Sequence, residues 1–338
     1  MSTARVAIIG TGAKEAGGMG KAHAKNYLEL EGVDLVSCAD IDEEAAHWFA
    51  EAYGIDAANV FTDYREMLEN VELDLVSVCT PITTHAEIVL DCITSGQING
   101  VHCEKPIAHT WGDCLRMADA AAEHDVQLTI SHQLRHCEPV RRMHAAVSNG
   151  DIGEVTTIQM SRDDIFEAGI HMVDIGTYLA GDAPAEWVMG QVDHRDAEWR
   201  KGTLVENQTV GCWKHENGVT GLAVTGQGTD AIGTNVRVTG TDGVLEYRHG
   251  NPSRIRGHDE AEWTTFEGEY QWHRPIRRAL QDALDGLAGE TPPVLDIQHA
   301  LVSTSIVFGI YESARSGGRI DFPLSIEDNP LEAMVEGQ

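Results

Sequence analysis

A lysine and a histidine in this sequence could manage the charge and the proton of a reacting hydroxyl group. Lys105 directly follows the expected strand 100–104, and a lysine at the end of a buried strand is unusual unless it has a partner or a task. Its ammonium can donate a hydrogen bond to a substrate oxygen. His171 can accept a hydroxyl proton at neutral pH. These two residues are therefore the first candidates for catalysis.

Glu167 stands four residues before His171, in the stretch Glu167-Ala-Gly169-Ile-His171. On a helix or its entry turn this spacing lets both side chains face the same space, where a carboxylate could orient the ring and stabilise its charged form. The acidic residue could equally belong to the first turn of a helix. Because the chain has 16 histidines, the pattern makes His171 a candidate and does not single it out.

A glycine-rich turn follows the first apolar run, 6–10. It contains Gly10, Gly12, Met19 and Gly20, with about five more residues between Gly12 and Gly20 than a G-x-G-x-x-G fingerprint has. Glycines let the backbone approach a pyrophosphate, which the next helix N-terminus stabilises. The alternative is a flexible loop, but the position between a strand and a helix favours dinucleotide binding.

The end of the second expected strand carries Asp40. A carboxylate there can accept both ribose hydroxyls of NAD and would repel the 2′-phosphate of NADP. Asp42 competes for this role, and a strand-end aspartate can also simply form a turn. The sequence favours NAD as cofactor, with NADP less favoured.

Two further stretches follow buried strands, and the carboxyl ends of parallel strands are where open α/β sheets bind ligands. We expect Thr80, Pro81 and His85 to flank the nicotinamide and Glu104 to border it. Hydroxyl recognition is assigned to four polar residues beyond these stretches, with ordinary surface positions as the alternative: Gln133, Arg135, Arg162 and Asp163.

The first 130 residues alternate between strand and helix patterns. The strands lack polar alternation, which indicates a parallel sheet buried on both faces and hence an α/β, doubly wound Rossmann domain. The expected strands are 6–10, 33–40, 73–80, 100–104 and 127–131, and the expected helices 20–30, 42–53, 64–69, 85–95 and 111–124.

The pattern becomes rich in β-strands after Gly153, with hairpin signals at Asn217-Gly218 and Asp242-Gly243. This predicts a C-terminal α+β domain with an open, mainly antiparallel sheet. We expect an NAD-binding domain over 1–130, a substrate-binding and oligomerisation domain over 131–338, and an active site in the cleft between them. The expected strands are 154–162, 186–195, 208–216, 219–225, 235–239 and 243–248, and the expected helices 171–180, 270–288 and 294–316.

Charge and composition limit the possible partners. A net charge of −30 argues against nucleic acid and anionic membranes. No apolar run approaches the ~20 residues of a membrane span, and the N-terminus lacks a signal-peptide plan. Seven cysteines without a C-x-x-C pair favour reduced thiols, a cytoplasmic location and no metal site. The excess of acidic over basic residues is typical either of a protein from a high-salt cytoplasm or of an ordinary acidic protein.

Taken together, these motifs resemble the Gfo/Idh/MocA family of glucose–fructose oxidoreductase and inositol dehydrogenase-like proteins. The resemblance runs nearly end to end and includes the glycine turn with His23, Thr80 to His85, Glu104-Lys105-Pro106, Glu167 to His171, and Tyr311-Glu-Ser313-Ala-Arg315-Ser-Gly317. It implies that Lys105 hydrogen-bonds the reacting oxygen, that His171 is the acid–base, and that the open sheet forms dimers or tetramers. Similar enzymes usually have Asp where this chain has Glu167.

The predicted activity is therefore an NAD-dependent dehydrogenase acting on a carbinol carbon of a sugar or cyclitol. One alternative is a redox-assisted glycosidase with tightly bound NAD, and another is a non-catalytic sugar-responsive regulator. Inositols, aldoses, amino sugars and nucleotide sugars all stay open as substrates, with the acidic balance favouring a neutral polyol.

Overall fold

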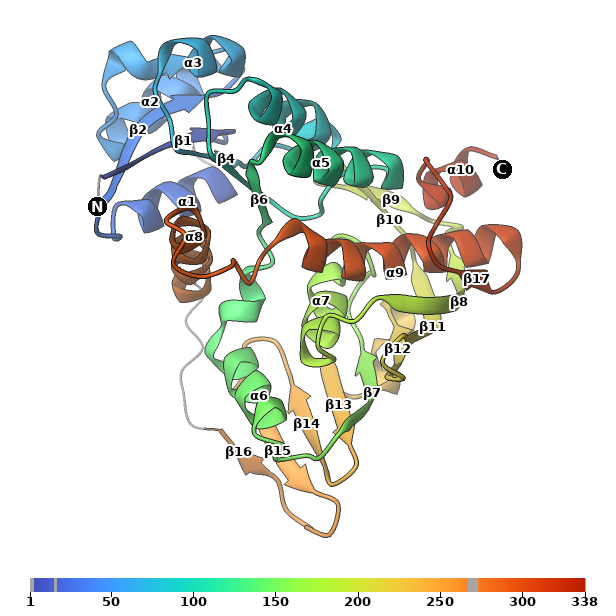
Figure 1. The fold of residues 1–338 in the computed structure, drawn as a ribbon. Helices are drawn as coiled ribbons and strands as arrows, with labels where there is room; N and C mark the ends of the chain where they lie inside the picture. Colours follow the sequence, from blue (N-terminus) through green and yellow to red (C-terminus); the bar gives the residue numbers. More distant parts are fainter. Residues whose placement is uncertain (1–2, 15–16, 267–272, 338) are drawn as a thin grey trace. The chain divides into compact units, whose positions relative to one another are not determined.

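The computed structural model describes residues 3–14, 17–266 and 273–337. It divides into two compact units (Figure 1). Unit 1 comprises Met1–His109, Asp113–Gln133 and Trp272–Gln298, and unit 2 comprises Thr110–Gly112, Leu134–Gln271 and His299–Gln338.

Unit 1 is built on a six-stranded parallel sheet of order β3-β2-β1-β4-β5-β6. This order confirms the predicted doubly wound fold and reverses direction between β1 and β4, the switch point at which such sheets bind ligands. The strands are β1 (Ala4–Ile9), β2 (Val33–Ala39), β3 (Val60–Phe61), β4 (Leu75–Val78), β5 (Gly100–Cys103) and β6 (Gln127–Ile130).

The helices of unit 1 match the five predicted in the first 130 residues and add one from much later in the chain. The late helix is α8 (His273–Leu287), and Figure 1 shows it beside α1. The others are α1 (Met19–Tyr27), α2 (Glu43–Tyr53), α3 (Tyr64–Asn70), α4 (His85–Thr94) and α5 (Trp111–His124), whose first two residues belong to unit 2.

Helix α8 was expected in the second domain, and that expectation is wrong. Its residues Ile276, Leu280, Ala283 and Leu284 lie in one buried cluster with Val6 and other residues of the Rossmann core. The helical spacing of these apolar side chains was recognised in the sequence, but spacing does not reveal which core they enter. A contiguous second domain from 131 to 338 therefore does not describe the chain, and positions 270–272 of the expected helix lie outside the described residues.

Unit 2 contains a nine-stranded sheet of order β16-β15-β14-β13-β7-β12-β11-β8-β17. Every neighbouring pair is antiparallel except β12 and β7, which confirms the mainly antiparallel sheet. The six predicted strands are β7 (Val155–Met160), β8 (Ala185–Asp193), β11 (Gln208–His215), β12 (Thr220–Val224), β13 (Val236–Gly240) and β14 (Gly243–Tyr247).

Five strands of unit 2, each of two to four residues, were not predicted. Two of them form a separate hairpin, β9 (Glu198–Arg200) with β10 (Thr203–Val205). The other three extend the large sheet: β15 (Arg254–Gly257), β16 (Thr264–Thr265) and β17 (Ile320–Asp321).

Helices cover one face of the large sheet. A β-carbon on Gly176 would lie 3.2 Å from Ile158, and one on Gly211 would lie 2.5 Å from Ile310, so α7 and α9 pack closely on this face. On the opposite face Met189 and Val210 are each 45% exposed. The helices of this part are α6 (Glu138–Ser148), α7 (Ile170–Leu179), α9 (Ile297–Ser316, beginning in unit 1) and α10 (Pro330–Glu336).

Candidate functional site

The glycine turn of unit 1 lies between β1 and α1. Gly10 and Gly12 adopt φ of +93° and +74°, which glycine alone adopts without strain. A β-carbon on Gly20 would lie 2.2 Å from the carbonyl oxygen of Gly10, so the first turn of α1 can pack on this turn only if residue 20 is glycine. The fit places the N-terminus of α1 directly beside the turn, where it can stabilise an anion.

The extra residues of this turn leave its two ends close together. A β-carbon on Gly12 would lie 3.9 Å from the Cα of Gly18, and Gly18 caps α1. Lys21 holds the loop by donating to the carbonyl oxygens of Ala13 and Lys14, at 2.5 and 3.0 Å. Residues 15 and 16 lie outside the described part of the chain. The insertion therefore leaves the contact between Gly10 and Gly20 intact.

Asp40 lies beside the glycine turn. Its Oδ2 accepts hydrogen bonds from the backbone N–H of Thr11 at 2.7 Å, from the Thr11 hydroxyl at 2.9 Å and from the Gly12 N–H at 3.2 Å. The competing candidate Asp42 instead caps α2, accepting from the Ala45 N–H at 3.1 Å. Asp40 is therefore the carboxylate that the fold brings to the turn.

A cavity of about 380 Å³ opens at the carboxyl ends of β1, β2 and β4. Its position at the switch point and its glycine floor fit a dinucleotide. The charged residues that line it are the acidic Asp40 and Glu87. The full lining is Ile9, Gly10, Gly12, Ala39, Asp40, Ile41, Thr62, Tyr64, Cys79, Thr80, Pro81, Thr84, Glu87 and Ile88.

His85 was expected beside the nicotinamide, but the structure shows it buried between two turns. Its Nε2 lies 2.9 Å from the carbonyl oxygen of Thr80 and its Nδ1 lies 3.0 Å from that of Pro106. Burial lowers the pKa of His85, and the neutral ring donates to one of these oxygens at a time. His85 thus connects the Thr80 turn to the turn that carries Lys105.

Glu104 is also turned inward. Its Oε1 lies 3.1 Å from Nε2 of the fully buried His23, whose Nδ1 lies 3.2 Å from Ser77 Oγ. Burial raises the pKa of Glu104, but His23, Ser131 and Lys105 together lower it to about 2. The ionised carboxylate is therefore held within unit 1, and its charge acts on the adjoining Lys105, which is half-buried at the carboxyl end of β5.

In unit 2, His171 lies in the first turn of α7, and Glu167 lies in the segment that leads into this helix. The Glu167 carboxylate is 3.1 Å from Nζ of Lys201, which is in the turn of the β9–β10 hairpin. The side chains of Glu167 and Lys201 are 15% and 82% exposed. An exposed lysine therefore balances the charge of Glu167.

The segment before His171 is a tight loop built on Asp164, which sequence reasoning missed. Asp164 Oδ1 accepts from the N–H groups of Glu167 and Ala168, at 2.6 and 2.9 Å. A β-carbon on Gly169 would lie 2.0 Å from the carbonyl oxygen of Asp164, which explains the glycine of the acid-x-Gly-x-His pattern. The sequence analysis selected the neighbouring residue Asp163, which is exposed, whereas Asp164 is buried.

Asp164 is expected to make stability depend on pH. Burial, with Glu206 and Glu167 nearby, raises the pKa of Asp164 to about 6. In the unfolded chain this pKa is near 4. The carboxyl therefore contributes stability that is fully present below pH 4 and is lost as the pH rises through 6. Relative to wild type, Asp164→Asn should gain about 2 kcal/mol in unfolding free energy between pH 4 and pH 8. Urea unfolding at both values measures this, and parallel pH curves would contradict it.

Arg135 was assigned to substrate recognition, and the structure contradicts that. Its guanidinium donates to Asp174 at 2.7 and 2.8 Å and to Asp182 at 2.8 Å, and it lies 4.7 Å from the Tyr178 ring centroid. The side chain is 1% exposed. Both carboxylates come from unit 2 itself, so Arg135 is a structural cation, placed by partners 39 and 47 residues away.

The other expected recognition residues differ in their surroundings. Gln133 is 3% exposed, and its Oε1 has no hydrogen-bond partner in the described part of the chain. Such an acceptor is what a ligand could complete. Arg162 is half-buried and Asp163 exposed. The three remain predictions.

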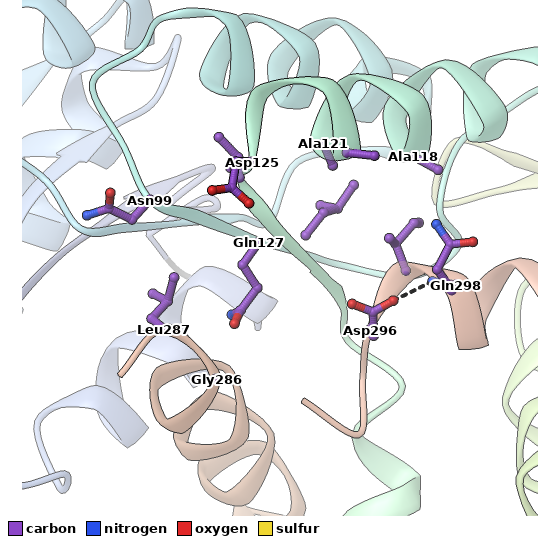
Figure 2. Close-up of a pocket in the computed structure, with 13 residues that line it drawn as sticks. Asn99, Ala118, Ala121, Asp125, Gln127, Gly286, Leu287, Asp296 and Gln298 are labelled. Carbon is purple, nitrogen blue, oxygen red and sulfur yellow. Dashed lines mark hydrogen bonds between the residues drawn. The ribbon is translucent and has the colours of Figure 1, made fainter. Parts of the chain in front are cut away.

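A second cavity, of about 460 Å³, lies at the amino ends of β5 and β6 (Figure 2). Asn99, Asp125 and Gln127 line it, together with Asp296, which accepts a hydrogen bond from the Gln298 N–H at 2.8 Å. This edge is opposite to the glycine turn, so the cavity is not the expected cofactor site.

Two family models match this chain. One describes an oxidoreductase family with an NAD-binding Rossmann fold and matches residues 4–132, and the other describes the C-terminal α/β domain of the same family and matches residues 165–322. The chain belongs to the Gfo/Idh/MocA oxidoreductase family. Its unit 1 is therefore an NAD-binding Rossmann domain.

Similar members of the Gfo/Idh/MocA family include two bacterial dehydrogenases. A myo-inositol 2-dehydrogenase of Thermotoga maritima is 26% identical over 54% of this chain and 56% of its own length. A D-glucoside 3-dehydrogenase of Escherichia coli is 26% identical over 95% of this chain and 98% of its own length. An oxidoreductase from Agrobacterium radiobacter, solved with NAD+, L-tartaric acid and magnesium, shares the fold with a TM-score of 0.79 at 19% identity, covering 98% of this chain and all of that one.

The described helices include none with the length and apolar character to cross a membrane. Within the same described residues, no three or more His, Cys, Asp or Glu side chains gather as metal ligands would.

Proposed function

We propose that this family member is an NAD-dependent dehydrogenase that transfers a hydride between the nicotinamide and a carbinol carbon of a sugar or cyclitol. The observation that carries the proposal is the cavity at the switch point, which Gly10, Gly12 and Asp40 line. The cavity reaches the end of β4, and the neighbouring strand β5 ends just before Lys105. The names of the relatives, an inositol and a D-glucoside dehydrogenase, support the substrate class.

The cofactor would be held by Gly10, Gly12, Met19 and Gly20 at the pyrophosphate, by Asp40 at the ribose, and by Thr80 with Pro81 toward the nicotinamide. Five of these residues line the cavity, and Met19 and Gly20 begin α1. NAD supplies the hydride acceptor when it is bound. The Lys105 ammonium donates to the carbinol oxygen and stabilises negative charge on it. The His171 imidazole takes the hydroxyl proton, with Glu167 stabilising the imidazolium.

The deciding experiment follows absorbance at 340 nm with NAD, and separately NADP, across inositols, free aldoses, methyl glucosides, amino sugars and nucleotide sugars. NADH formation with one class, lost in Lys105→Ala, supports the proposal and names the substrate. If no compound yields NADH, the dehydrogenase proposal is abandoned.

A redox-assisted glycosidase is the second candidate, because the relative matched over 98% of its length is named for a D-glucoside. It predicts that the purified protein carries NAD and cleaves an aryl glucoside without net NADH. A sugar that shifts the melting temperature while nothing turns over would instead indicate a regulator.

The preference for NAD over NADP is expected to depend on Asp40. Because a carboxylate repels the 2′-phosphate, Asp40→Ser should lower the ratio of NAD to NADP kcat/KM by about 10- to 100-fold. Asp42→Ser is the matched control: it removes the same charge two residues away, keeps an N-cap side chain on α2 and should leave the ratio unchanged. An equal effect of both substitutions would remove Asp40 from the ribose site.

The exposed face of the large sheet supports assembly into a homodimer or homotetramer. Met189 and Val210 lie on it beside the half-buried Leu222 and Val224, and apolar side chains gathered on one face favour burial by a partner. Val210→Arg should shift the sedimentation coefficient to that of a monomer. The control Leu28→Arg changes an apolar residue of unit 1 that is 57% exposed, and it should leave the sedimentation coefficient unchanged. A monomeric wild type would contradict the proposal.

We also propose a cytoplasmic location. The support is that all seven cysteines are thiols outside any disulfide, five of them buried, as expected where thiols stay reduced.

A further inference from the structure

A buried carboxylate in unit 2 gathers donors from four separate segments. Glu206 is 4% exposed. Its Oε1 accepts from the Ile165 N–H at 2.7 Å and from the hydroxyls of Thr209 and Thr225 at 3.0 and 3.2 Å, and its Oε2 accepts from the Tyr311 hydroxyl at 2.8 Å. A buried carboxylate is costly unless it is hydrogen-bonded, so these donors and the charge depend on one another.

Tyr311 connects this carboxylate to α9. Its side chain is fully buried, and burial together with the neighbouring Glu206 raises its pKa, so the phenol stays protonated and donates. The ring of Phe166 packs edge-on against Tyr311 and Phe308, at centroid distances of 6.3 and 5.3 Å. Helix α9 thus holds Phe166 directly and holds the adjacent Ile165 through Glu206.

Ile165 and Phe166 belong to the tight loop that leads into α7. Asp164 fixes the backbone of Glu167 and Ala168, and Gly169 touches Asp164 closely, so the loop cannot shift at one end alone. His171 follows two residues after Gly169. A displacement of Ile165 is therefore transmitted to His171, and an error of 1 Å in a reacting group can cost about 100-fold in rate.

We propose that Glu206 and Tyr311 are positioning residues that fix the loop 164–169 and thereby place His171. This inference rests on the proposed acid–base function of His171. In the contacts described above, Glu206 and Tyr311 reach the loop 164–169 and not His171 itself. It also gives a role to the tyrosine of the Tyr311-Glu-Ser313 stretch. Ser313, half a turn along the same helix, has other partners: it accepts from the Gly190 N–H at 2.9 Å and donates to the Gly318 carbonyl at 2.5 Å.

The test compares Tyr311→Phe with Ser313→Ala in the full-length protein. Tyr311→Phe keeps the ring and removes only the donor to Glu206, so kcat should fall 10- to 100-fold while KM for NAD is unchanged. Ser313→Ala removes two part-buried hydrogen bonds made by a residue of the same helix and should keep kcat within threefold. Glu206→Gln keeps an acceptor for Ile165 and can donate to the tyrosine oxygen, so it should retain far more activity than Glu206→Ala.

Hydrogen–deuterium exchange provides a readout that does not depend on activity. In Tyr311→Phe, backbone amides of 164–169 should exchange at least tenfold faster, with β11 unchanged, and Ser313→Ala should match wild type. Unchanged exchange in Tyr311→Phe, or equal acceleration in both variants, overturns the inference. If the wild type lacks dehydrogenase activity but the exchange result holds, the proposed function fails while the positioning of the loop stands.

Discussion

Replacement of His171 by asparagine is expected to lower kcat by about 10²- to 10⁴-fold, the usual contribution of a general base. The asparagine keeps a polar side chain of similar size in the first turn of α7 but cannot accept the hydroxyl proton. The Kd for NAD should stay unchanged, because the glycine turn and Asp40 belong to unit 1. Steady-state rates across pH 5–10 and NAD titration by fluorescence measure both quantities.

The pH profile decides whether His171 acts as a base. The acidic limb of the kcat/KM profile in the wild type should disappear in His171→Asn. His144→Asn is the matched control, since this histidine of the same unit stacks on Tyr178 with a centroid distance of 4.3 Å. If His171→Asn retains the acidic limb, another group takes the proton.

Replacement of Arg135 by methionine is expected to lower the free energy of unfolding by about 3–5 kcal/mol. The substitution would leave Asp174, which is 1% exposed, and Asp182 without the guanidinium that neutralises them. Urea unfolding monitored by tryptophan fluorescence measures the loss.

A surface arginine serves as the control for that measurement. Arg142 pairs with Glu138 on α6 at 2.9 Å and is 53% exposed, so Arg142→Met should cost less than about 1 kcal/mol. Adding Asp174→Asn to Arg135→Met should recover part of the stability by removing one unpaired charge. Equal losses in the two methionine variants would show that the buried pairs contribute no more than a surface pair.

Features that depend on local sequence could be predicted. The strand–turn–helix around Gly10 and Gly20 combines a buried apolar run with glycines. Each of the six long strands of the second sheet is recognisable from the pattern of apolar residues within the strand itself. Asp40 was identifiable because its distance from the glycine turn reflects the length of one β-α-β unit.

Features that depend on distant partners could not be predicted from the sequence. Arg135 looks like a free cation until Asp174 and Asp182 are brought to it. Glu206 shows no signal because two of its four donors lie 41 residues before it and 105 after it. His85 and Glu104 follow β4 and β5 in the chain, but their inward orientation depends on Pro106 and His23. Sequence reasoning therefore located the site's backbone better than the partners of its side chains.

The late arrival of α8 has a consequence for synthesis on the ribosome. The cluster that contains Val6, Ile8 and Tyr27 is completed by Ile276, Leu280 and Leu284, which are translated after the whole of residues 134–271. At about 5–20 residues per second, the nascent Rossmann sheet waits for many seconds with this surface uncovered. We expect chaperones to bind the nascent chain during that interval, and a fragment that stops at residue 133 would keep the surface uncovered permanently.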